Sequence, residues 1–394
     1  MDPITNPFSP GAGVYPPELV GREDVLRRAQ LLIDRVRAGR PEKSILLTGL
    51  RGVGKTVLLS EVKRRAAEAG YHALMVEAPE QSGLVQNLTP QLRTLLLELD
   101  RGAAVNAQVR RALGALKAFA SAVRVSYGGL NVNLDFDSEP GIADSGNLEA
   151  DLADLFVAVS QAASARDSRV ALLIDEMQYL SELELRSLTM AMHRLQQEGL
   201  PLVLVGAGLP TLPGLAGRAR SYAERLFDYP SIGPLPIREA AQAVERPLQV
   251  AGVQIDAAAL AEIFRLTQGY PYFLQEWAYQ VWNRAHDSPI GLESVHAATP
   301  MVIQRLDEGF FRVRFDRLTR GERRYLRAMA ELPGPERTTG RVAEILGFHV
   351  TSMGPTRAHL INKGMVFSPE HGLLEFTVPL FDDFMRRMMP TLTG

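Results

Sequence analysis

Eight consecutive residues in the first quarter of the chain have the types and spacing of a phosphate-binding loop. They read Gly49-Leu50-Arg51-Gly52-Val53-Gly54-Lys55-Thr56 and fit the pattern G-x-x-x-x-G-K-[ST]. Glycines let a backbone wrap closely around phosphate, and a helix that begins at this point adds positive potential. We expect Lys55 to reach the β- and γ-phosphates and Thr56 to ligate Mg²⁺. The sequence therefore predicts ATP or ADP with Mg²⁺ as ligands, bound by Gly49, Gly52, Val53, Gly54, Lys55, Thr56 and Val57.

A second motif supplies the acids that such a site needs. The apolar run Val170–Ile174 is followed directly by Asp175 and Glu176. Asp175 is expected to hold Mg²⁺, directly or through water. Glu176 is placed to orient or deprotonate an attacking water, which is the task of a general base. A strand that ends in acids is common, but its combination with a lysine loop indicates nucleotide hydrolysis.

Short apolar strands and helices alternate around these motifs. The runs Ser44–Thr48, Ala73–Val76, Val170–Ile174 and Leu202–Val205 read as strands. Helical spacing follows over 56–69 and 182–198, and Ser181 with Glu184 could form a capping box at the start of the latter helix. Fully apolar strands that alternate with helices predict an α/β fold with a mostly parallel sheet covered on both faces.

An insertion between the second and third strands has a different pattern. Residues 123–127 and 130–136 alternate between apolar and polar types and are separated by Gly128-Gly129. Two alternating runs joined in this way predict a β-hairpin with one apolar face. That face either packs on its own domain or meets a partner.

Composition limits the possible classes of protein. The chain has 394 residues, of which 46% are hydrophobic and 22% charged, with a net charge of −2. This charge gives no general attraction to nucleic acid or membrane. The absence of cysteine excludes disulfides and Cys-ligated zinc. The uncharged stretch 200–217 holds three prolines and four glycines, so we expect a strand and loop there and not a membrane span, in a cytoplasmic protein.

With these motifs the chain resembles the AAA+ superfamily of P-loop ATPases, on the branch of origin-recognition initiators and STAND signalling ATPases. Val20-Gly21-Arg22-Glu23 is similar to the entry motif that lines the adenine pocket in that branch, and Gly269-Tyr270-Pro271 to its lid motif. The likeness is greatest to widespread bacterial ATP-binding proteins of unassigned role. It implies nucleotide contacts from Val20, Arg22 and Pro271.

The same resemblance implies the architecture. It predicts a five-stranded core with strand order 5-1-4-3-2, a helical lid and a C-terminal winged helix. We expect a flexible N-terminal segment at 1–17, an ATPase core at 18–235 with an insertion at about 79–150, a lid at 236–309 and a winged helix domain at 310–394.

Three departures from the family pattern bear on turnover. Gly206-Ala207-Gly208 offers no side chain where the family often senses the γ-phosphate, and Tyr272 stands where many members have a lid arginine. Arg225 resembles the arginine finger that a neighbouring subunit supplies, with Arg218 and Arg220 as rivals. The missing sensor residues favour slow hydrolysis in a switch over rapid turnover in a motor.

The C-terminal part reads as three helices followed by a hairpin, which is typical of a winged helix-turn-helix. Residues 310–394 hold 13 basic and 9 acidic residues, a net charge of +4, with arginines gathered in the first helix and Glu370 at the wing tip. The polar residues predicted for the third helix are Thr351, Ser352, Arg357 and Lys363. Double-stranded DNA is the expected partner, and a docking module for protein is the alternative.

The sequence thus leaves two functions open. The first is a DNA-binding ATPase switch that could form a homo-oligomer. The second is a scaffold that stays locked on nucleotide, has negligible turnover and recruits a protein partner. Glu176 favours the first, and the missing sensor side chains favour the second. A small-molecule kinase fits less well, because a lid and a winged helix have no place in it.

Overall fold

The computed structural model describes residues 1–11, 13–78, 83–100, 106–127, 141–370 and 372–392. The chain forms two compact units, which alternate along the sequence. The first unit consists of Arg22–Gly49 and Lys55–Ile232. The second unit consists of Met1–Gly21, Leu50–Gly54 and Gly233–Gly394.

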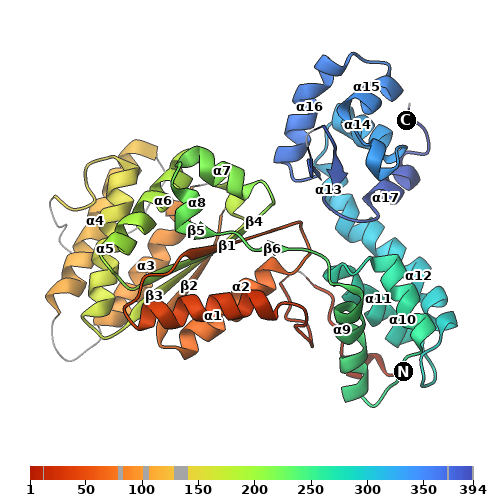
Figure 1. Ribbon diagram of the computed structural model, residues 1–394, viewed down its shortest axis with the longest axis horizontal. Helices are drawn as coiled ribbons and strands as arrows, with labels where there is room; N and C mark the ends of the chain where they lie inside the picture. The colour runs from red at the N-terminus through yellow and green to blue at the C-terminus, as the bar shows by residue number, and fades with distance from the viewer. Residues whose placement is uncertain (12, 79–82, 101–105, 128–140, 371, 393–394) are drawn as a thin grey trace. The chain divides into compact units, whose positions relative to one another are not determined.

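A parallel sheet forms the centre of the first unit (Figure 1). Its strands are β1 (Ser44–Gly49), β2 (Tyr71–Glu77), β3 (Arg169–Asp175), β4 (Leu202–Gly208), β5 (Phe227–Asp228) and β6 (Ser231–Ile232). The order β2-β3-β4-β1-β5 confirms the expected strand order. The fifth strand is split, because β5 and β6 pair with successive parts of β1 on either side of Tyr229 and Pro230.

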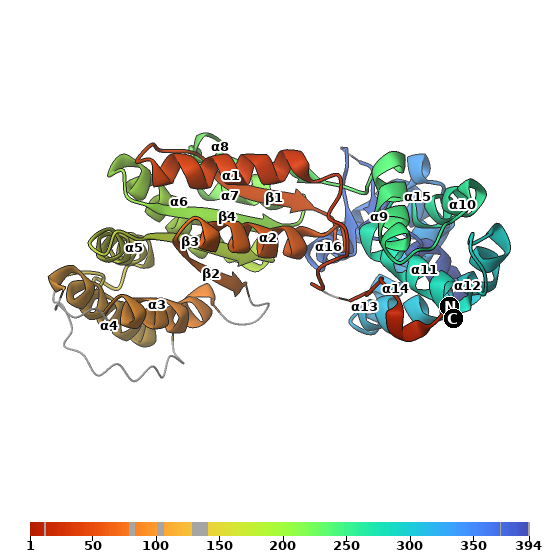
Figure 2. The same ribbon diagram turned by 90° about the horizontal axis from the view of Figure 1, so that it is seen from below.

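Helices cover both faces of this sheet. They are α1 (Glu23–Arg37), α2 (Lys55–Glu68), α3 (Leu84–Asp100), α4 (Ala107–Tyr127), α5 (Leu148–Ser164), α6 (Glu182–Gln197), α7 (Leu212–Ala219) and α8 (Ala223–Leu226). The helices α1 and α2 pack together along one face, as Figure 2 shows. On the other face α5 packs against α6 and β3, α3 packs against β2, and α4 packs against α3 and α5. The apolar strands are therefore enclosed, as their lack of alternation predicted.

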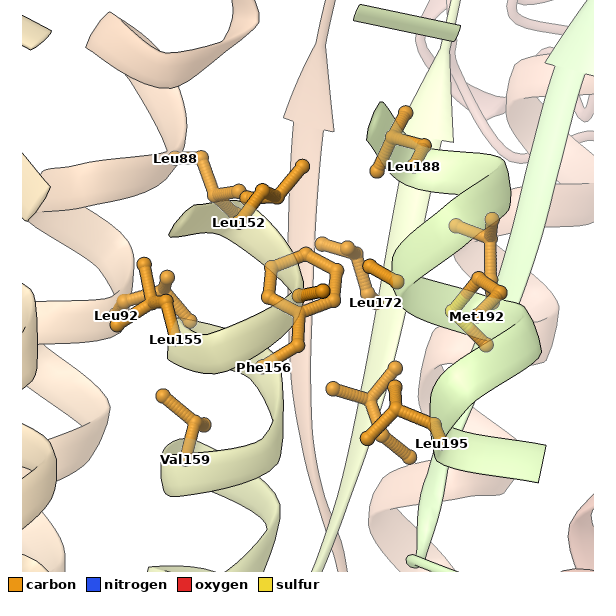
Figure 3. Packing of buried hydrophobic residues seen from close by; sticks show 14 of the residues in the cluster. Leu88, Leu92, Leu152, Leu155, Phe156, Val159, Leu172, Leu188, Met192 and Leu195 are labelled. Carbon is orange, nitrogen blue, oxygen red and sulfur yellow. The ribbon is translucent and has the colours of Figure 1, made fainter. Parts of the chain in front are cut away.

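A hydrophobic core lies between the sheet and this second helical layer (Figure 3). Phe156 of α5 is fully buried and lies between Leu172 of β3 and the leucines of α3. Burying a side chain of this kind stabilises the fold by about 1.5–3 kcal/mol. The predicted capping box at the start of α6 is present, with the Ser181 hydroxyl accepting from the Glu184 N–H at 3.3 Å. Local capping and burial thus place α6 beside β3.

The predicted hairpin in the insertion is wrong for its first half. Residues 123–127 continue α4 to Tyr127, and residues 128–140 lie outside the described part of the chain. The preceding residues of α4 bury Val109, Leu113 and Leu116 at helical spacing. Extending a helix that has already formed adds one hydrogen bond per residue. The established helix therefore overrides the local alternation.

The second unit contains a bundle of helices followed by a smaller helical domain. The bundle consists of α9 (Ile237–Val250), α10 (Ala257–Thr267), α11 (Pro271–Arg284) and α12 (Leu292–Arg305). A π-helical turn over Leu306–Phe311 joins α12 to α13 (Arg312–Asp316). Gly269 has φ +72°, and a Cβ there would lie 2.0 Å from the carbonyl oxygen of Leu235. Only glycine fits the break between α10 and α11.

The N-terminal segment differs from the flexible tail that the sequence predicted. Its residues bind along α11: the indole of Trp282 donates to the carbonyl of Asp2 at 2.8 Å, and the Asn6 amide donates to the carbonyl of Tyr279 at 3.0 Å. Phe8 is fully buried. The segment is therefore fixed by partners that lie about 270 residues later in the chain.

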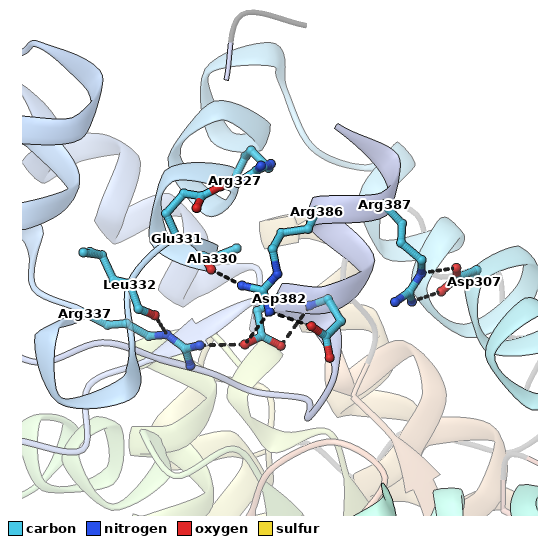
Figure 4. A network of polar contacts seen from close by, with 10 residues as sticks. Asp307, Arg327, Ala330, Glu331, Leu332, Arg337, Asp382, Arg386 and Arg387 are labelled. Carbon is cyan, nitrogen blue, oxygen red and sulfur yellow. Dashed lines mark hydrogen bonds and ion pairs between the residues drawn. The ribbon is translucent and has the colours of Figure 1, made fainter. Parts of the chain in front are cut away.

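The last part of the second unit contains α14 (Arg320–Ala330), α15 (Thr339–Leu346), α16 (Val350–Asn362) and α17 (Phe381–Met388). Between α16 and α17, β7 (Val366–Phe367) and β8 (Glu375–Phe376) pair antiparallel. Ion pairs hold this part together (Figure 4). Arg337 pairs with Asp382 at 2.7 Å, and Arg387 of α17 pairs with Asp307 of the π turn at 2.6 Å. None of the helices that the structure describes is both long and apolar enough to span a bilayer.

Candidate functional site

The predicted phosphate loop lies between β1 and α2, as the motif requires. Gly52 and Gly54 have φ values of +81° and +95°, which side chains disfavour, so both positions need glycine. Lys55 is the first residue of α2, and its side chain is buried. Its Nζ donates to the carbonyl of Gly49 at 2.9 Å. A buried ammonium that donates to a neutral carbonyl is suited to exchange that contact for phosphate oxygens.

Thr56 and Asp175 come together across α2 and β3. The Thr56 hydroxyl donates to Oδ2 of Asp175 at 2.5 Å, and the N–H of Glu176 donates to Oδ1 at 2.8 Å. Burial raises the pKa of Asp175, and these two hydrogen bonds offset that effect only in part. Hydroxyl and carboxylate oxygens are the ligands that Mg²⁺ prefers. The adjacent oxygens of Thr56 and Asp175 therefore fit a magnesium ion shared with a nucleotide phosphate.

Glu176 follows β3 in a left-handed backbone conformation, with φ +53° and ψ +36°. A short 3₁₀ turn, Met177–Tyr179, comes next and carries Gln178. The Nε2 of Gln178 donates to Oε2 of Glu176, while its Oε1 accepts from the N–H of Leu209 at 3.0 Å. The sequence analysis missed Gln178. A polar residue two positions after the acid was the only available signal.

The three candidate finger arginines differ in their partners. Arg220 pairs with Glu149, which also pairs with Arg186 at 2.7 Å. Arg218 and Arg225 are exposed, and neither forms an ion pair with any residue in the described ranges. The structure thus holds Arg220 within its own unit and leaves Arg218 and Arg225 accessible.

The remaining residues predicted to bind nucleotide are divided between the two units. Val20 and Pro271 belong to the second unit, where Pro271 is the first residue of α11. Arg22 and Val57 belong to the first unit. Arg22 is buried next to the start of α1, and burial lowers the pKa of its guanidinium. Val53 is fully buried within the loop.

Comparison with protein families covers most of the first unit. Residues 18–205 match the family described as the AAA ATPase domain. This segment is an AAA+ P-loop ATPase domain. The match includes the lysine loop and the Asp175–Glu176 pair, so it agrees with the parallel sheet and with the nucleotide site. Residues 308–385 match a domain of unknown function, DUF8462. No curated protein matches the chain.

Solved structures resemble the whole chain at low sequence identity. The Walker-type ATPase PABY2304 of Pyrococcus abyssi is 14% identical, covers 93% of this chain and 96% of its own, and has a TM-score of 0.54. The RuvB Holliday junction branch migration motor of Thermotoga maritima is 16% identical over 90% and 92%, with a TM-score of 0.46. The ORC1 protein of Aeropyrum pernix, in a complex with DNA, is 14% identical over 95% and 94%, with a TM-score of 0.46. The likeness to the Pyrococcus protein is one of fold, and it extends beyond the residues that match the ATPase domain.

Proposed function

We propose that the chain binds ATP with Mg²⁺, hydrolyses it slowly and acts as a nucleotide-dependent switch. The observation that carries this proposal is the joining of Thr56 to Asp175 at 2.5 Å, beside the buried Lys55. These groups come from two elements that are 119 residues apart in the chain, and they match the division of tasks in P-loop enzymes. The AAA ATPase domain match over the same residues supports it.

Each side chain then has a distinct role. Lys55 neutralises the β- and γ-phosphates, and Thr56 and Asp175 hold the magnesium ion. The ion supplies charge neutralisation on the phosphate oxygens when it is bound. Glu176 accepts a proton from the attacking water, with its carboxylate held by Gln178. Val20, Arg22 and Pro271 are the adenine contacts that the family resemblance implies.

Slow turnover follows from the missing family residues. The end of β4 is Gly206-Ala207-Gly208, so this strand offers no polar side chain to the γ-phosphate. Tyr272 cannot supply the positive charge of a lid arginine. Fewer groups that stabilise charge in the transition state mean a lower rate.

Homo-oligomerisation would complete the site with an arginine. Arg225 is the proposed finger, and its exposure leaves it accessible to a neighbouring subunit. Specific activity should then rise with protein concentration, and Arg225→Ala should abolish this rise while Arg218→Ala retains it. A concentration-independent rate from a protein that light scattering shows to be monomeric in ATP would contradict the role.

DNA is the proposed target of the switch, through a winged helix formed by α14, α15, α16 and the β7–β8 hairpin. In α16 only Leu360 is buried, so most of this helix is accessible to a groove. Arg320, Arg324 and Arg357 form no ion pair with any part of the chain that the structure describes. These three guanidinium groups are the proposed phosphate and base contacts.

Two other basic side chains of this region already contact groups of the protein itself. Lys363 pairs with Glu322 at 2.7 Å, and Arg327 is buried with its Nε donating to the carbonyl of Met389 at 2.5 Å. Neither is suited to contact phosphate. The basic surface is therefore smaller than the net charge of +4 implies.

The scaffold alternative has an observation of its own. Phe348 and Val350, at the start of α16, are 49% and 45% exposed. Aromatic and aliphatic side chains at this position favour contact with a protein over contact with phosphate. In this case α16 would dock a protein partner in one nucleotide state.

Steady-state ATP hydrolysis, measured with and without duplex DNA, distinguishes these functions. A slow rate that DNA changes supports the switch. Binding of ATP without turnover under any condition supports the scaffold. Absence of ATP binding would overturn both.

A further inference from the structure

We infer that Gln178 is a positioning residue that occupies the place left free by the glycines of β4. It acts through Glu176, whose carboxylate it orients toward the attacking water. The inference rests on the proposed hydrolysis and assigns this side chain a place in it. Three observations carry it: the direction of the Gln178 amide, the shape of the turn that holds it, and the glycines beneath it.

The amide of Gln178 can have only one orientation. A backbone N–H, that of Leu209, faces one of its terminal atoms at 3.0 Å, and such a group only donates. The atom that faces Leu209 must therefore be the oxygen. The amide nitrogen then faces Oε2 of Glu176, to which it donates. A carboxylate that accepts a hydrogen bond from a fixed donor has a fixed direction.

The turn after β3 brings Gln178 to this place. Glu176 has the left-handed backbone conformation, and the N–H of Tyr179 donates to the carbonyl of Glu176 at 3.0 Å. This tight turn reverses the chain directly after the acid. Left-handed residues other than glycine are uncommon, and they occur often at functional sites. The reversal carries the side chain of Gln178 from the end of β3 to the end of β4.

The glycines of β4 provide the space for this arrangement. A Cβ at Gly208 would lie 3.1 Å from Oε1 of Gln178 and 2.9 Å from a methyl carbon of Leu212. A Cβ at Gly206 would lie 2.0 Å from the sulfur of Met177. A side chain on β4 at either position would displace the turn. The glycines that leave β4 without a sensor side chain are thus the same residues that make room for Gln178.

A purely structural role is the competing explanation, since the bond to Leu209 also ties β3 to β4. The substitution Gln178→Glu separates the two roles. A glutamate keeps an oxygen for the N–H of Leu209 but replaces the donor to Glu176 with a second carboxylate oxygen. We expect kcat to fall by about 10–100-fold, the range for a misplaced reacting group, with the Kd for ATP within about twofold of wild type.

A double-mutant cycle with Glu176→Gln supplies the decisive readout. If Gln178 acts through Glu176, Gln178→Glu should cause no further loss of kcat in the Glu176→Gln background. The matched control is Gln196→Glu in α6, where the amide donates to the carbonyl of Glu42 at 3.0 Å. This control should leave kcat unchanged.

The contrary outcomes are distinct. Wild-type kcat in Gln178→Glu, or the same loss of kcat in both backgrounds, would overturn the positioning role alone. A lower melting temperature with weakened ATP binding and unchanged kcat would make Gln178 a structural tie. A wild-type protein that binds ATP but shows no turnover would overturn the hydrolysis proposal, and this inference with it.

Discussion

The end of the sheet around Asp175 and the face of α16 both carry candidate chemistry, but they hold their polar groups in opposite ways. Lys55 and Asp175 are buried, and each is bonded to a defined partner in its own unit. On α16, Thr351 and Ser352 are exposed. Buried polar groups must be paired, and their pairing fixes geometry. The fixed geometry of an enclosed site therefore indicates its reaction, whereas exposed side chains on a surface specify a partner only weakly.

Loss of the proposed base should have the greatest effect on the enclosed site. Glu176→Gln should lower kcat by about 10²–10⁴-fold, the usual contribution of a positioned base, while ATP affinity is kept. Steady-state hydrolysis and calorimetry measure the two quantities. Glu182→Gln, at an exposed position in the first turn of α6, is the matched control. Hydrolysis at the wild-type rate by the Glu176 variant would remove this residue from the mechanism.

The second test concerns Lys55. Lys55→Ala removes one charge-assisted contact to phosphate, which costs about 1.5–3 kcal/mol, or roughly 10–150-fold in the Kd for ATP. ADP should lose less affinity, because it lacks the γ-phosphate. Calorimetry with each nucleotide measures the difference. Lys63→Ala, at an exposed position of the same helix, should bind like wild type. Equal ATP affinity in all three proteins would refute the assignment of the loop.

The third test compares a buried arginine with an exposed one on α14 of the second unit. Arg327→Ala leaves the carbonyl of Met389 without its donor and should lower the free energy of unfolding by about 1–3 kcal/mol. Arg320→Ala, at an exposed position of the same helix, should leave stability within about 0.5 kcal/mol of wild type. Urea unfolding measures both. An equal loss of unfolding free energy in both variants would mean that Arg327 contributes no more to stability than Arg320 does.

The smallest expected effect is on DNA affinity. Contacts from Arg320, Arg324 and Arg357 predict a slope of log K against log salt near −3, since each neutralised phosphate contributes about −0.9. Arg324→Ala should reduce this slope by about 1 and weaken binding to all sequences alike. Fluorescence anisotropy with several duplexes, from about 50 to 200 mM salt, measures it. No binding by the full chain at low salt would leave α16 to a protein partner.

The parts of the fold that could be predicted depend on short-range signals. The positions of four strands followed from apolar runs, the strand order from the family resemblance, and the capping box of Ser181 and Glu184 from their spacing. Gln178 could not be found in this way. Its bond to Leu209 spans 31 residues and exists only because β4 ends in glycines, which the sequence analysis interpreted as an absence.

Two further errors have physical causes of the same kind. The alternation over 123–127 was a correct local pattern, but the helix that precedes it determined the outcome. The composition of the N-terminal segment gave no sign of its order, because its partners lie on α11. Local sequence carries propensity, whereas these features depend on contacts between distant residues.

The attachment of Asp2 to Trp282 has a consequence for how the protein is made. A ribosome adds about 5–20 residues per second, and 280 residues separate the two partners. Asp2 is therefore synthesised roughly 15–55 s before the indole that binds it. During that interval Phe8 lacks the burial that it has in the finished protein. The N-terminal segment can dock only after α11 has been translated, so these residues reach their native place long after they have been synthesised.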